Sequence, residues 1–463
     1  MFESKVYSSR RNKLRSLVSS GIILMPGNPE AAMNYAANTF HFRQDSNFLY
    51  YFGLDHPDFA GIIDVDNNCD IIFGNDVDMD DIIWMGFQPS VKEQAAKSGV
   101  ENTEPISKLE GFVKDALAKG RKVHIVKPYR GEVLIWLESL LGVHHSQVKN
   151  FISEELIHGI VSMRSVKENI EIEEIERAVD VAYIMHTTGM IMAKQGVVEQ
   201  QIAGAIEGIA ISYGGPVSFP VILSVDGQTL HNHYHGNILE EGRMMVIDAG
   251  CESANHYASD ITRTVPVGGK FNQRQKEIYE IVLKANVDSI KAIKPGAYYR
   301  EMHLLAAKTI ASGLKDLGLM KGDVDEAVAK GAHALFFPHG LGHMLGLDVH
   351  DMEGLGENFV GYDKTITRSD QFGLAFLRLA RKLEPGFVLT NEPGCYFIPA
   401  LIDQWRKEGR FTEFINYDKA ETYKDFGGVR IEDNILVTAD GYRVLGKPIP
   451  KTVEEVEKLM AVK

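Results

Sequence analysis

The segment FFPHGLGHMLGLDVHD, residues 336–351, holds three histidines spaced among glycines: His339, His343 and His350. Imidazole nitrogens bind metal ions or move protons, so a segment of this kind needs partner groups from elsewhere in the chain. The glycines disfavour a helix and no acid separates His339 from His343, so the segment is not the helical His-Glu-x-x-His zinc signature. If a metal binds here, His343 is the natural nitrogen ligand.

Four carboxylates in the second part of the chain stand at the ends of strand-like apolar stretches or inside them: Asp248 in MMVIDAG, Asp260 in YASDITRT, Glu392 in FVLTNEPG and Glu432 in GGVRIEDNILVT. A carboxylate is costly to bury without a cationic partner. If the turn between the two aspartates centres on Ala254, they face each other across a hairpin and repel unless protonated or bound to a cation. Each acid alone is typical of an ordinary strand end, but the set together with His343 favours a metal site.

The number and type of these ligands indicate which metal they suit. Four carboxylates and one imidazole are too many for one tetrahedral zinc ion. They suit a pair of harder ions with two carboxylates bridging. The prediction is two divalent ions per chain, Mn²⁺ by preference, with Co²⁺, Zn²⁺ and Fe²⁺ left open.

The elements that must position these groups divide the chain in two. A length of 463 residues exceeds what one hydrophobic core usually organises, so two domains are expected. The first third mixes a helical stretch, RRNKLRSLVSS, with strands at GIILMPG and RKVHIVKP and a hairpin at FAGIIDVDNNCDIIFG, which is α/β in character. Helical spacing then runs from about Ile170 to Ala193, with Ser165 as a candidate N-cap. We therefore expect domains at residues 1–165 and 166–463, with the unusual acids and histidines in the second.

Composition restricts the partners. A formal net charge of −14 argues against nucleic acid and against an anionic membrane surface, because both are bound through surplus Lys and Arg. No run of about 18 apolar residues exists, and the charged start lacks the apolar stretch of a secretion signal. The chain has three cysteines, an odd number, and their spacing is not that of a metal site. This pattern is typical of reduced thiols in a reducing compartment. These features predict a cytoplasmic protein that acts on small or neutral substrates.

The ordered series Asp248, Asp260, His343, Glu392 and Glu432 resembles the dinuclear metal site of the pita-bread metallopeptidases, which include methionine aminopeptidase, aminopeptidase P and prolidase. The stretches FRQDSNFLYYFG, HGLGHMLGLDVHD, LEPGFVLTNEPGCYF and FGGVRIEDNILVT are similar to the proline-specific branch of that family. The resemblance covers the whole chain. It implies an aminopeptidase P-like α/β N-terminal domain followed by an α+β pita-bread catalytic domain.

One interval departs from the family pattern. In the family the second aspartate follows the first by eleven residues, whereas Asp260 follows Asp248 by twelve. We expect the extra residue at the hairpin turn, in SANH. If it lay within a strand, every side chain beyond it would change face and the assignment of Asp260 would fail.

The resemblance also implies roles for the five ligands. Asp248 would bind one metal, Asp260 and Glu432 would bridge both, and His343 with Glu392 would complete the second. A water between the metals would have its pKa lowered enough to attack as hydroxide near neutral pH. Glu392 is then the best candidate to take and pass on the proton.

Four further residues match family positions around the ligands. His350 resembles the histidine that hydrogen-bonds the substrate and helps to stabilise the tetrahedral intermediate, and His231 matches the other substrate-facing histidine in motif and spacing. His339 and Arg430 are candidates for supporting the ligands. His339 can do so through a hydrogen bond, and Arg430, which precedes Glu432 by two residues on the same strand face, can brace a ligating carboxylate.

The family members imply several activities. We favour an Xaa-Pro aminopeptidase acting on peptides with proline at the second position. Dimers are common for such enzymes, so a homodimer is expected. The alternatives are an Xaa-Pro dipeptidase restricted to dipeptides, a metal-free creatinase-like hydrolase, and a non-catalytic peptide-binding protein on the same fold. An Xaa-Pro bond has no N–H, so a site that holds the free N-terminus near the metals and gives the proline ring a pocket can accept it.

A dipeptidase must recognise the proline carboxylate, whereas an aminopeptidase must leave that direction open. Arg378, Arg381 and Lys382, in RLARKLEPG, are the candidates for such a carboxylate clamp, with a basic solvent-facing helix end as the favoured interpretation. The aromatic residues Phe336 and Tyr396 flank the motifs, and core packing is their favoured interpretation.

Overall fold

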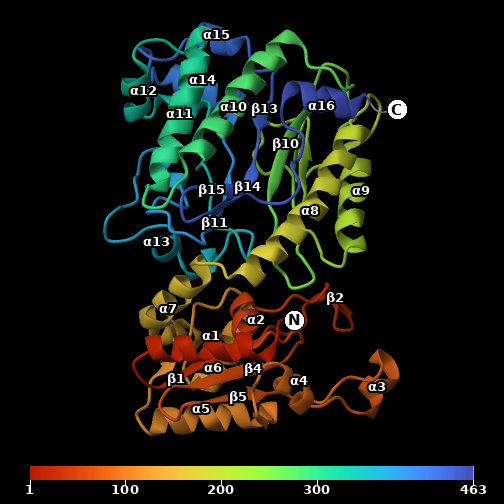
Figure 1. The fold of residues 1–463 in the computed structure, drawn as a ribbon, viewed down its shortest axis with the longest axis vertical. Helices are drawn as coiled ribbons and strands as arrows, with labels where there is room; N and C mark the ends of the chain where they lie inside the picture. Colours follow the sequence, from red (N-terminus) through yellow and green to blue (C-terminus); the bar gives the residue numbers. More distant parts are fainter. Residues whose placement is uncertain (462–463) are drawn as a thin grey trace. The chain divides into compact units, whose positions relative to one another are not determined.

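The structure is a computed structural model that describes residues 1–461, and it divides the chain into two compact units, Met1–Arg164 and Ser165–Lys463. Figure 1 shows the helices and strands of both units. None of the helices among the described residues is both long enough and apolar enough to cross a membrane.

The first unit is built on a mixed sheet with the strand order β6-β5-β4-β1-β7. Its strands and the small hairpin β2/β3 are β1 (Ile22–Pro26), β2 (Ala32–Tyr35), β3 (Asn38–Thr39), β4 (Ala60–Asp64), β5 (Cys69–Phe73), β6 (Asn102–Glu104) and β7 (Val123–His124). Its helices are α1 (Ser4–Leu17), α2 (Ser46–Phe52), α3 (Met79–Met85), α4 (Val91–Lys97), α5 (Leu109–Ala118), α6 (Gly131–Leu141) and α7 (Glu154–Ser165), with 3₁₀ turns at Ile106–Lys108 and His145–Phe151. The predicted helix, strands and antiparallel hairpin of this region are confirmed.

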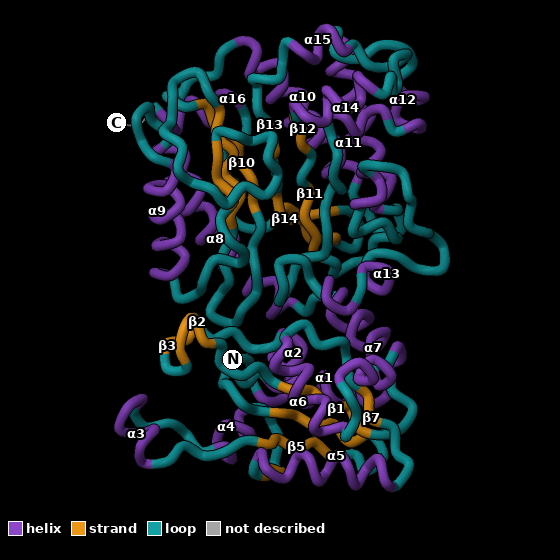
Figure 2. Tube along the Cα trace, turned by 180° about the vertical axis from the view of Figure 1, so that it is seen from behind, coloured by secondary structure: helices purple, strands orange, loops and turns teal. Residues whose placement is uncertain are grey.

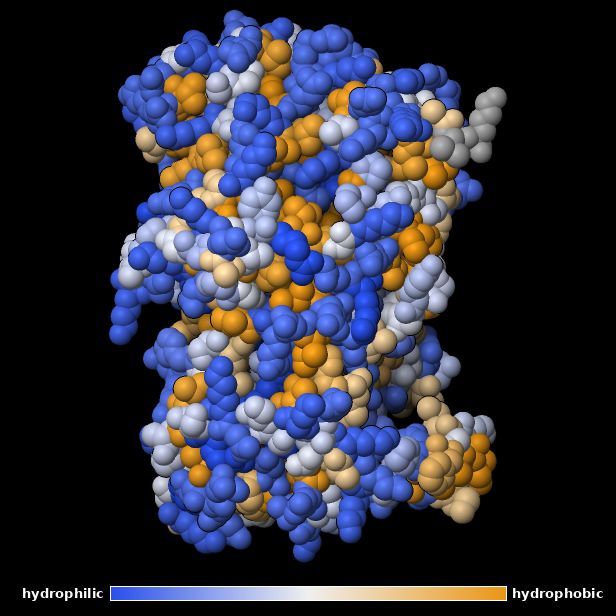
Figure 3. All heavy atoms as spheres, viewed as in Figure 1, coloured by the Kyte–Doolittle hydropathy of each residue, from blue (hydrophilic) through white to orange (hydrophobic). Residues whose placement is uncertain are grey.

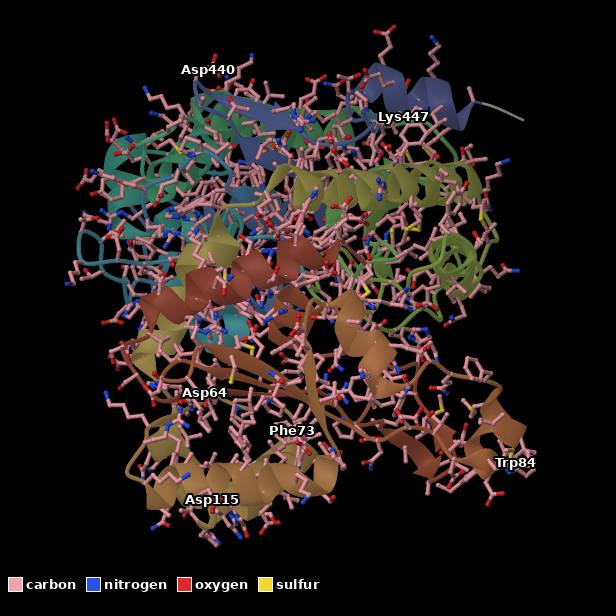
Figure 4. All side chains as sticks on the ribbon, turned by 60° about the horizontal axis from the view of Figure 1, so that its bottom comes forward. Asp64, Phe73, Trp84, Asp115, Asp440 and Lys447 are labelled. Carbon is pink, nitrogen blue, oxygen red and sulfur yellow. The ribbon has the colours of Figure 1, made fainter. Side chains whose placement is uncertain are left out.

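Apolar side chains join this sheet to α5 and α6. Phe73 of β5 and Phe112 of α5 meet edge to face, with ring centroids 5.7 Å apart. Figure 4 shows Phe73 on the sheet and Asp115 on the outer side of α5. The helix therefore turns one apolar face to the sheet and its charged face to solvent, as amphipathic spacing requires.

Helix α3 departs from this pattern because its apolar side chains are exposed. Ile83 and Trp84 of α3 are 68% and 84% exposed, and Phe87, two residues after the helix, is 81% exposed. The segment forms an apolar projection from the first unit (Figure 3), with Trp84 at its outer end (Figure 4). Exposed apolar groups gathered in one place are typical of surfaces that contact another molecule.

The second unit contains two helix pairs and several short sheets. Its helices are α8 (Asn169–Met192), α9 (Glu199–Ser212), α10 (Gln273–Ala292), α11 (Tyr299–Asp316), α12 (Val324–Lys330), α13 (Glu357–Val360), α14 (Pro399–Lys407), α15 (Tyr417–Glu421) and α16 (Val453–Met460), with 3₁₀ turns at Ala332–Leu335, Glu353–Leu355 and Leu374–Phe376. Its strands are β8 (Ile222–Ser224), β9 (Met244–Ala249), β10 (Ile261–Pro266), β11 (Val388–Asn391), β12 (Gly394–Tyr396), β13 (Gly428–Arg430), β14 (Asp433–Val437) and β15 (Tyr442–Val444).

The sheets of this unit have the orders β10-β9-β8, β11-β14-β15 and β12-β13. Helix α8 packs beside α9 and helix α10 beside α11. Figure 2 shows the strands lying between these two helix pairs. The strands β9, β11 and β14 are buried along their whole length, so polar side chains at their ends are held in a rigid, dry setting.

The prediction that Ser165 caps the long helix was wrong. Ser165 is the last residue of α7, and an N-cap needs extended rather than helical backbone. That position belongs to Glu168, whose backbone is extended, with φ −72° and ψ 157°. Its backbone N–H donates to the carboxylate of Glu171 at 2.9 Å, which fixes the start of α8.

Candidate metal centre

The hairpin of β9 and β10 carries the two aspartates, but its register differs from the prediction. Thr262, rather than Asp260, is the partner of Asp248, so the turn is centred one residue later than expected. Asp260 precedes Thr262 by two residues and thus lies diagonally from Asp248 on the same face. The same register continues to the bridge between Glu252 and Ala258, so the additional residue lies in the turn and not in a strand.

Glu432 was predicted inside a strand and instead lies in the break between β13 and β14. Its backbone N–H donates to the carbonyl of Thr262 at 3.0 Å, and its carboxylate accepts from the Thr262 hydroxyl at 2.7 Å. The backbone at Glu432 belongs to neither β13 nor β14, because it is hydrogen-bonded to Thr262 of β10 instead. Thr262 therefore holds both the backbone and the carboxylate of Glu432.

His343 lies in an irregular segment, as the glycines predicted, and its ring is fixed by its neighbours. Its backbone N–H donates to the Thr390 hydroxyl at 3.1 Å, and its Nδ1 lies 3.0 Å from the carbonyl of Met344. A ring that gives Nδ1–H to a carbonyl keeps Nε2 free for a ligand. That Nε2 lies 3.3 Å from Asp260 Oδ2, and Asp260, His343 and Glu432 offer ligand atoms within 4.8 Å of one another.

Glu392 follows directly after β11, as predicted, and completes the set. Its Oε1 lies 3.8 Å from His343 Nε2, and its Oε2 lies 3.9 Å from His339 Nδ1. Its side chain is 19% exposed, more than those of Asp260 and His343. It is thus the carboxylate of this group with the best access to a bound molecule.

Asp248 is held by a chain of hydrogen bonds that includes two of the predicted supporting residues. Arg430 donates from Nη2 to Asp248 Oδ2 at 2.6 Å and from Nη1 to the Tyr396 hydroxyl at 2.8 Å. The same hydroxyl lies 2.9 Å from His339 Nε2, while His339 Nδ1 lies 2.8 Å from the carbonyl of Gly340. Arg430 therefore braces Asp248 rather than Glu432, and Tyr396 is both buried and part of the site.

Burial of these acids together is electrostatically unfavourable without a cation. Burial and the charge of Asp248 raise the pKa of Asp260 well above its usual range, and burial with Asp260 does the same to the pKa of Glu432. Burial raises the pKa of Glu392 to about 8 and lowers that of His343 to about 4. Two buried oxygens, Asp248 Oδ1 and Glu432 Oε1, have no hydrogen-bond partner among the described residues. Unpaired carboxylate oxygens around a neutral imidazole fit a divalent metal centre.

The ligand group lies in the wall of a cavity of about 750 Å³, a size typical of small-molecule sites. Apolar side chains cover much of the wall: Phe219, Pro220, Ile222, Leu230, Phe372, Phe376, Ile398 and Leu401. His231, His339 and His350 also line the cavity. The two histidines predicted to face the substrate, His231 and His350, therefore open on the same space. The pKa of His231 is lowered by burial and by Arg430.

The three basic residues suggested as a carboxylate clamp separate in the structure. Arg378 lines the cavity. Arg381 instead lies over the ring of Phe387 at 4.7 Å, and Lys382 lies over that of Tyr298 at 5.3 Å. Among the three, Arg378 alone borders the cavity.

The loop that carries His350 is tied to the start of the second unit by a buried ion pair. Lys167 Nζ lies 2.8 Å from Asp351 Oδ2, and both side chains are 1% exposed. A buried pair with this geometry resists separation, because either partner alone would be a buried charge. The ion pair therefore fixes the backbone next to His350.

No role in the site was predicted for Thr262 or Lys167, and for Tyr396 core packing was the favoured interpretation. The alternation of strand side chains carried a signal for Thr262, because it lies two residues beyond Asp260 on the same face. For Tyr396 and Lys167 no local signal existed, since their partners are distant in the chain: Arg430 and Asp351.

A second group of potential ligands lies in the first unit, where Glu138, His144 and His145 offer ligand atoms within 4.8 Å of one another. Their side chains already bond to each other and to Ser146, with Glu138 Oε2 accepting from His145 N at 2.6 Å. They are partly or fully exposed and lack the buried, unpaired oxygens of the centre in the second unit.

Comparison with known proteins agrees with this geometry. The profile of metallopeptidase family M24 matches residues 173–439, and that of the aminopeptidase P N-terminal domain matches residues 7–126. The chain therefore belongs to metallopeptidase family M24, and the predicted α/β N-terminal domain followed by an α+β pita-bread catalytic domain is confirmed.

Individual relatives carry two different names. A probable Xaa-Pro aminopeptidase of Fusarium vanettenii is 34% identical over 91% of this chain and 88% of its own length. The Xaa-Pro dipeptidase of Homo sapiens is 32% identical over 96% of this chain and 90% of its own length. A variant of Escherichia coli aminopeptidase P, solved in complex with substrate, superposes with a TM-score of 0.81 at 30% identity, covering 99% of this chain and 98% of that one.

Proposed function

We propose that this metallopeptidase is an Xaa-Pro aminopeptidase, which hydrolyses the bond between an N-terminal residue and a following proline. One observation carries the proposal: Asp248, Asp260, His343, Glu392 and Glu432 all line one cavity of the second unit. Its similarity over nearly the full chain to Escherichia coli aminopeptidase P supports the same activity. We assign catalysis to residues 166–463 and treat residues 1–165 as the N-terminal domain.

The residues of the centre would hold two divalent ions. Asp248 would bind one, Asp260 and Glu432 would bridge both, and His343 with Glu392 would complete the second. When bound, such ions act as Lewis acids and lower the pKa of a water molecule, so that hydrolysis proceeds near neutral pH. The harder oxygen ligands favour Mn²⁺, with Co²⁺, Zn²⁺ and Fe²⁺ as alternatives.

The remaining side chains have separate tasks in this proposal. Glu392, the more accessible carboxylate, takes a proton at its carboxylate oxygen and passes it on. His231 and His350 hydrogen-bond the substrate from the cavity wall. Arg430 and His339 act through Tyr396 and Asp248 to hold the ligands in place.

The cavity also suits the proline side of the substrate. A proline nitrogen offers no N–H to a peptidase that binds its substrate by strand pairing. Apolar side chains such as Phe219, Phe372 and Phe376 can receive the pyrrolidine ring without a backbone hydrogen bond.

A second candidate function is an Xaa-Pro dipeptidase, which the position of Arg378 favours. Arg378 is 35% exposed at the cavity wall, where a guanidinium could pair with the carboxylate of a C-terminal proline. The guanidinium already forms ion pairs with two acidic neighbours: Arg378 Nε lies 3.1 Å from Glu353 Oε2 and 3.4 Å from Glu357 Oε1. This pairing weakens the case for a dedicated clamp.

The assembly and location are also part of the proposal. The exposed apolar side chains of Trp84 in α3 and Phe87 just after it support a homodimer, since a second copy would remove them from water. Free thiols at Cys69, Cys251 and Cys395 are compatible with the reducing cytoplasm.

A length series tests both candidates. The protein is stripped with a chelator, reloaded with Mn²⁺ and given Xaa-Pro dipeptides, Xaa-Pro-Yaa tripeptides and matched Xaa-Ala-Yaa controls. An aminopeptidase cleaves the tripeptides with kcat/KM at least equal to that of the dipeptides and leaves the alanine controls nearly untouched. A clear preference for dipeptides that Arg378→Gln abolishes would identify a dipeptidase. No cleavage of any proline peptide at any metal loading would refute both.

A further inference from the structure

Glu353, which no motif singled out, makes the closest contact to His350. Its Oε2 lies 2.5 Å from His350 Nδ1. The same oxygen accepts from Arg378 Nε at 3.1 Å. The side chains of Glu353 and His350 are 41% and 32% exposed, so this pair lies at the rim of the cavity rather than in the core.

A tight turn brings the two side chains together. The backbone N–H of Glu353 donates to the carbonyl of His350 at 3.1 Å. Within the turn Met352 has a φ of +63°, a conformation that favours glycine and is uncommon for other residues. The Met352 side chain is buried, and the neighbouring Asp351 is held by Lys167. Packing and the buried ion pair therefore hold this turn in a conformation that its sequence does not favour.

The contact determines which ring nitrogen faces the cavity. Hydrogen bonding to His350 and the charge of Arg378 lower the pKa of Glu353 to about 2, so its carboxylate accepts hydrogen bonds and does not donate them. His350 Nδ1 must then carry the hydrogen of this bond. Nε2 is the nitrogen left to a molecule in the cavity that His350 lines.

We propose that Glu353 is a positioning residue that fixes the ring orientation and tautomer of His350, so that Nε2 is presented to the substrate. The proposal rests on the substrate-binding role proposed above for His350. A carboxylate on the far nitrogen of a functional histidine is a recurrent device for setting its tautomer. Here the carboxylate lies three residues from the histidine, and the turn alone supplies the geometry.

Arg378 provides the competing explanation, in which Glu353 serves only to neutralise a guanidinium. Glu357 distinguishes the two explanations. Its Oε1 lies 3.4 Å from Arg378 Nε, and it also pairs with Arg368, but it has no contact with His350 in the described structure. Glu357→Ala therefore disturbs Arg378 without touching His350 and is the matched control.

The test compares Glu353→Ala, Glu353→Gln, Glu357→Ala, His350→Ala and the double variant of His350 and Glu353, all loaded with Mn²⁺ and assayed on an Xaa-Pro tripeptide. We expect Glu353→Ala to lower kcat by roughly 10- to 100-fold with bound metal unchanged, as for other partners of functional histidines. The amide oxygen of Glu353→Gln still accepts from Nδ1–H, so this variant should keep kcat within about threefold of the parent. The double variant should be no slower than His350→Ala, because Glu353 acts through His350.

A second readout does not depend on turnover. In ¹⁵N-histidine NMR spectra, the His350 signal is assigned by its loss in His350→Ala. It should show a protonated Nδ1 in the parent and in Glu353→Gln, and an averaged or different tautomer in Glu353→Ala.

The outcomes separate this inference from the proposed function. If His350→Ala keeps full activity, the proposed role of His350 fails. If His350→Ala is slow while Glu353→Ala and Glu353→Gln match the parent in rate and NMR spectrum, the positioning role of Glu353 is refuted. Equal losses in Glu353→Ala and Glu357→Ala would assign the effect to Arg378 and also overturn the inference.

Discussion

Replacing Glu392 by Gln should stabilise the metal-free protein while abolishing its activity. Glu392 lies among three other carboxylates, and burial raises its pKa from 4.5 to about 8. An acid whose pKa is raised by folding binds its proton more tightly in the folded state. Its contribution to stability is therefore present below pH 4.5 and is lost as the pH rises towards 8. A neutral amide has no such penalty.

The size of the effect follows from the two pKa values. With 4.5 in the unfolded chain and 8 in the folded one, the penalty is about 0.8 kcal/mol at pH 5 and about 3 kcal/mol at pH 7. The side chain is 19% exposed, so solvent screening reduces the value at pH 7 to roughly 2 kcal/mol. For a unit of this size that corresponds to an increase of about 4 °C in melting temperature.

Calorimetry after exhaustive chelation, at pH 5, 6 and 7, measures this shift. Glu207→Gln on the exposed face of α9 removes the same formal charge without relieving any buried repulsion, and it is the matched control. With added Mn²⁺ the parent should melt at a higher temperature than Glu392→Gln, because bound metal stabilises the parent more than the variant that lacks a ligand. A metal-free Glu392→Gln protein that melts at or below the parent at pH 7, or a shift that does not grow with pH, would refute the reasoning.

The other predictions concern the metals, His350 and two buried histidines outside the site. The protein should bind about two divalent ions per chain, and chelation should abolish activity reversibly; activity that survives in protein shown to be metal-free would exclude the dinuclear centre. Glu432→Ala should lose both bound metal and rate, because it removes a bridging carboxylate; near-normal metal content and turnover would place the bridge elsewhere. His350→Ala should keep its metal and fold while kcat falls by roughly 10² or more, whereas an unchanged kcat with a raised KM would indicate uniform substrate binding. Burial lowers the pKa of His303 to about 3 and that of His333 to about 4, so each binds protons more readily when unfolded, and stability should fall as the pH drops below 6.5; acid unfolding curves that His333→Gln leaves unchanged would contradict this.

The sequence predicted which residues gather at the candidate metal centre better than it predicted their geometry. Strand-end position and spacing were enough to select Asp248, Asp260 and Glu392, since burial of an acid at a strand end is unusual wherever the strand lies. The predicted partner of Asp248 was wrong by two residues, Asp260 instead of Thr262, because the sequence does not show how the turn closes. Glu432 leaves its strand because of hydrogen bonds to Thr262, a residue 170 positions away, and no local pattern encodes such a contact.

The same limit explains the supporting residues. Arg430 was predicted to brace a ligating carboxylate, but only the structure shows that its guanidinium reaches Asp248 on β9. Glu353 is close to His350 in the chain, yet a left-handed Met352 is what directs its carboxylate to the ring, and propensity gives no reason to expect that conformation.

The buried ion pair of Lys167 and Asp351 has a consequence for the response of this protein to ionic strength. Dissolved ions screen exposed charges within about 10 Å at 0.1 M salt, but they do not enter a pair whose side chains are 1% exposed. The loop next to His350 is therefore held equally firmly in dilute buffer and in concentrated salt. A change of kcat/KM with salt would then report how a molecule with a net charge of −14 attracts or repels a charged peptide before binding.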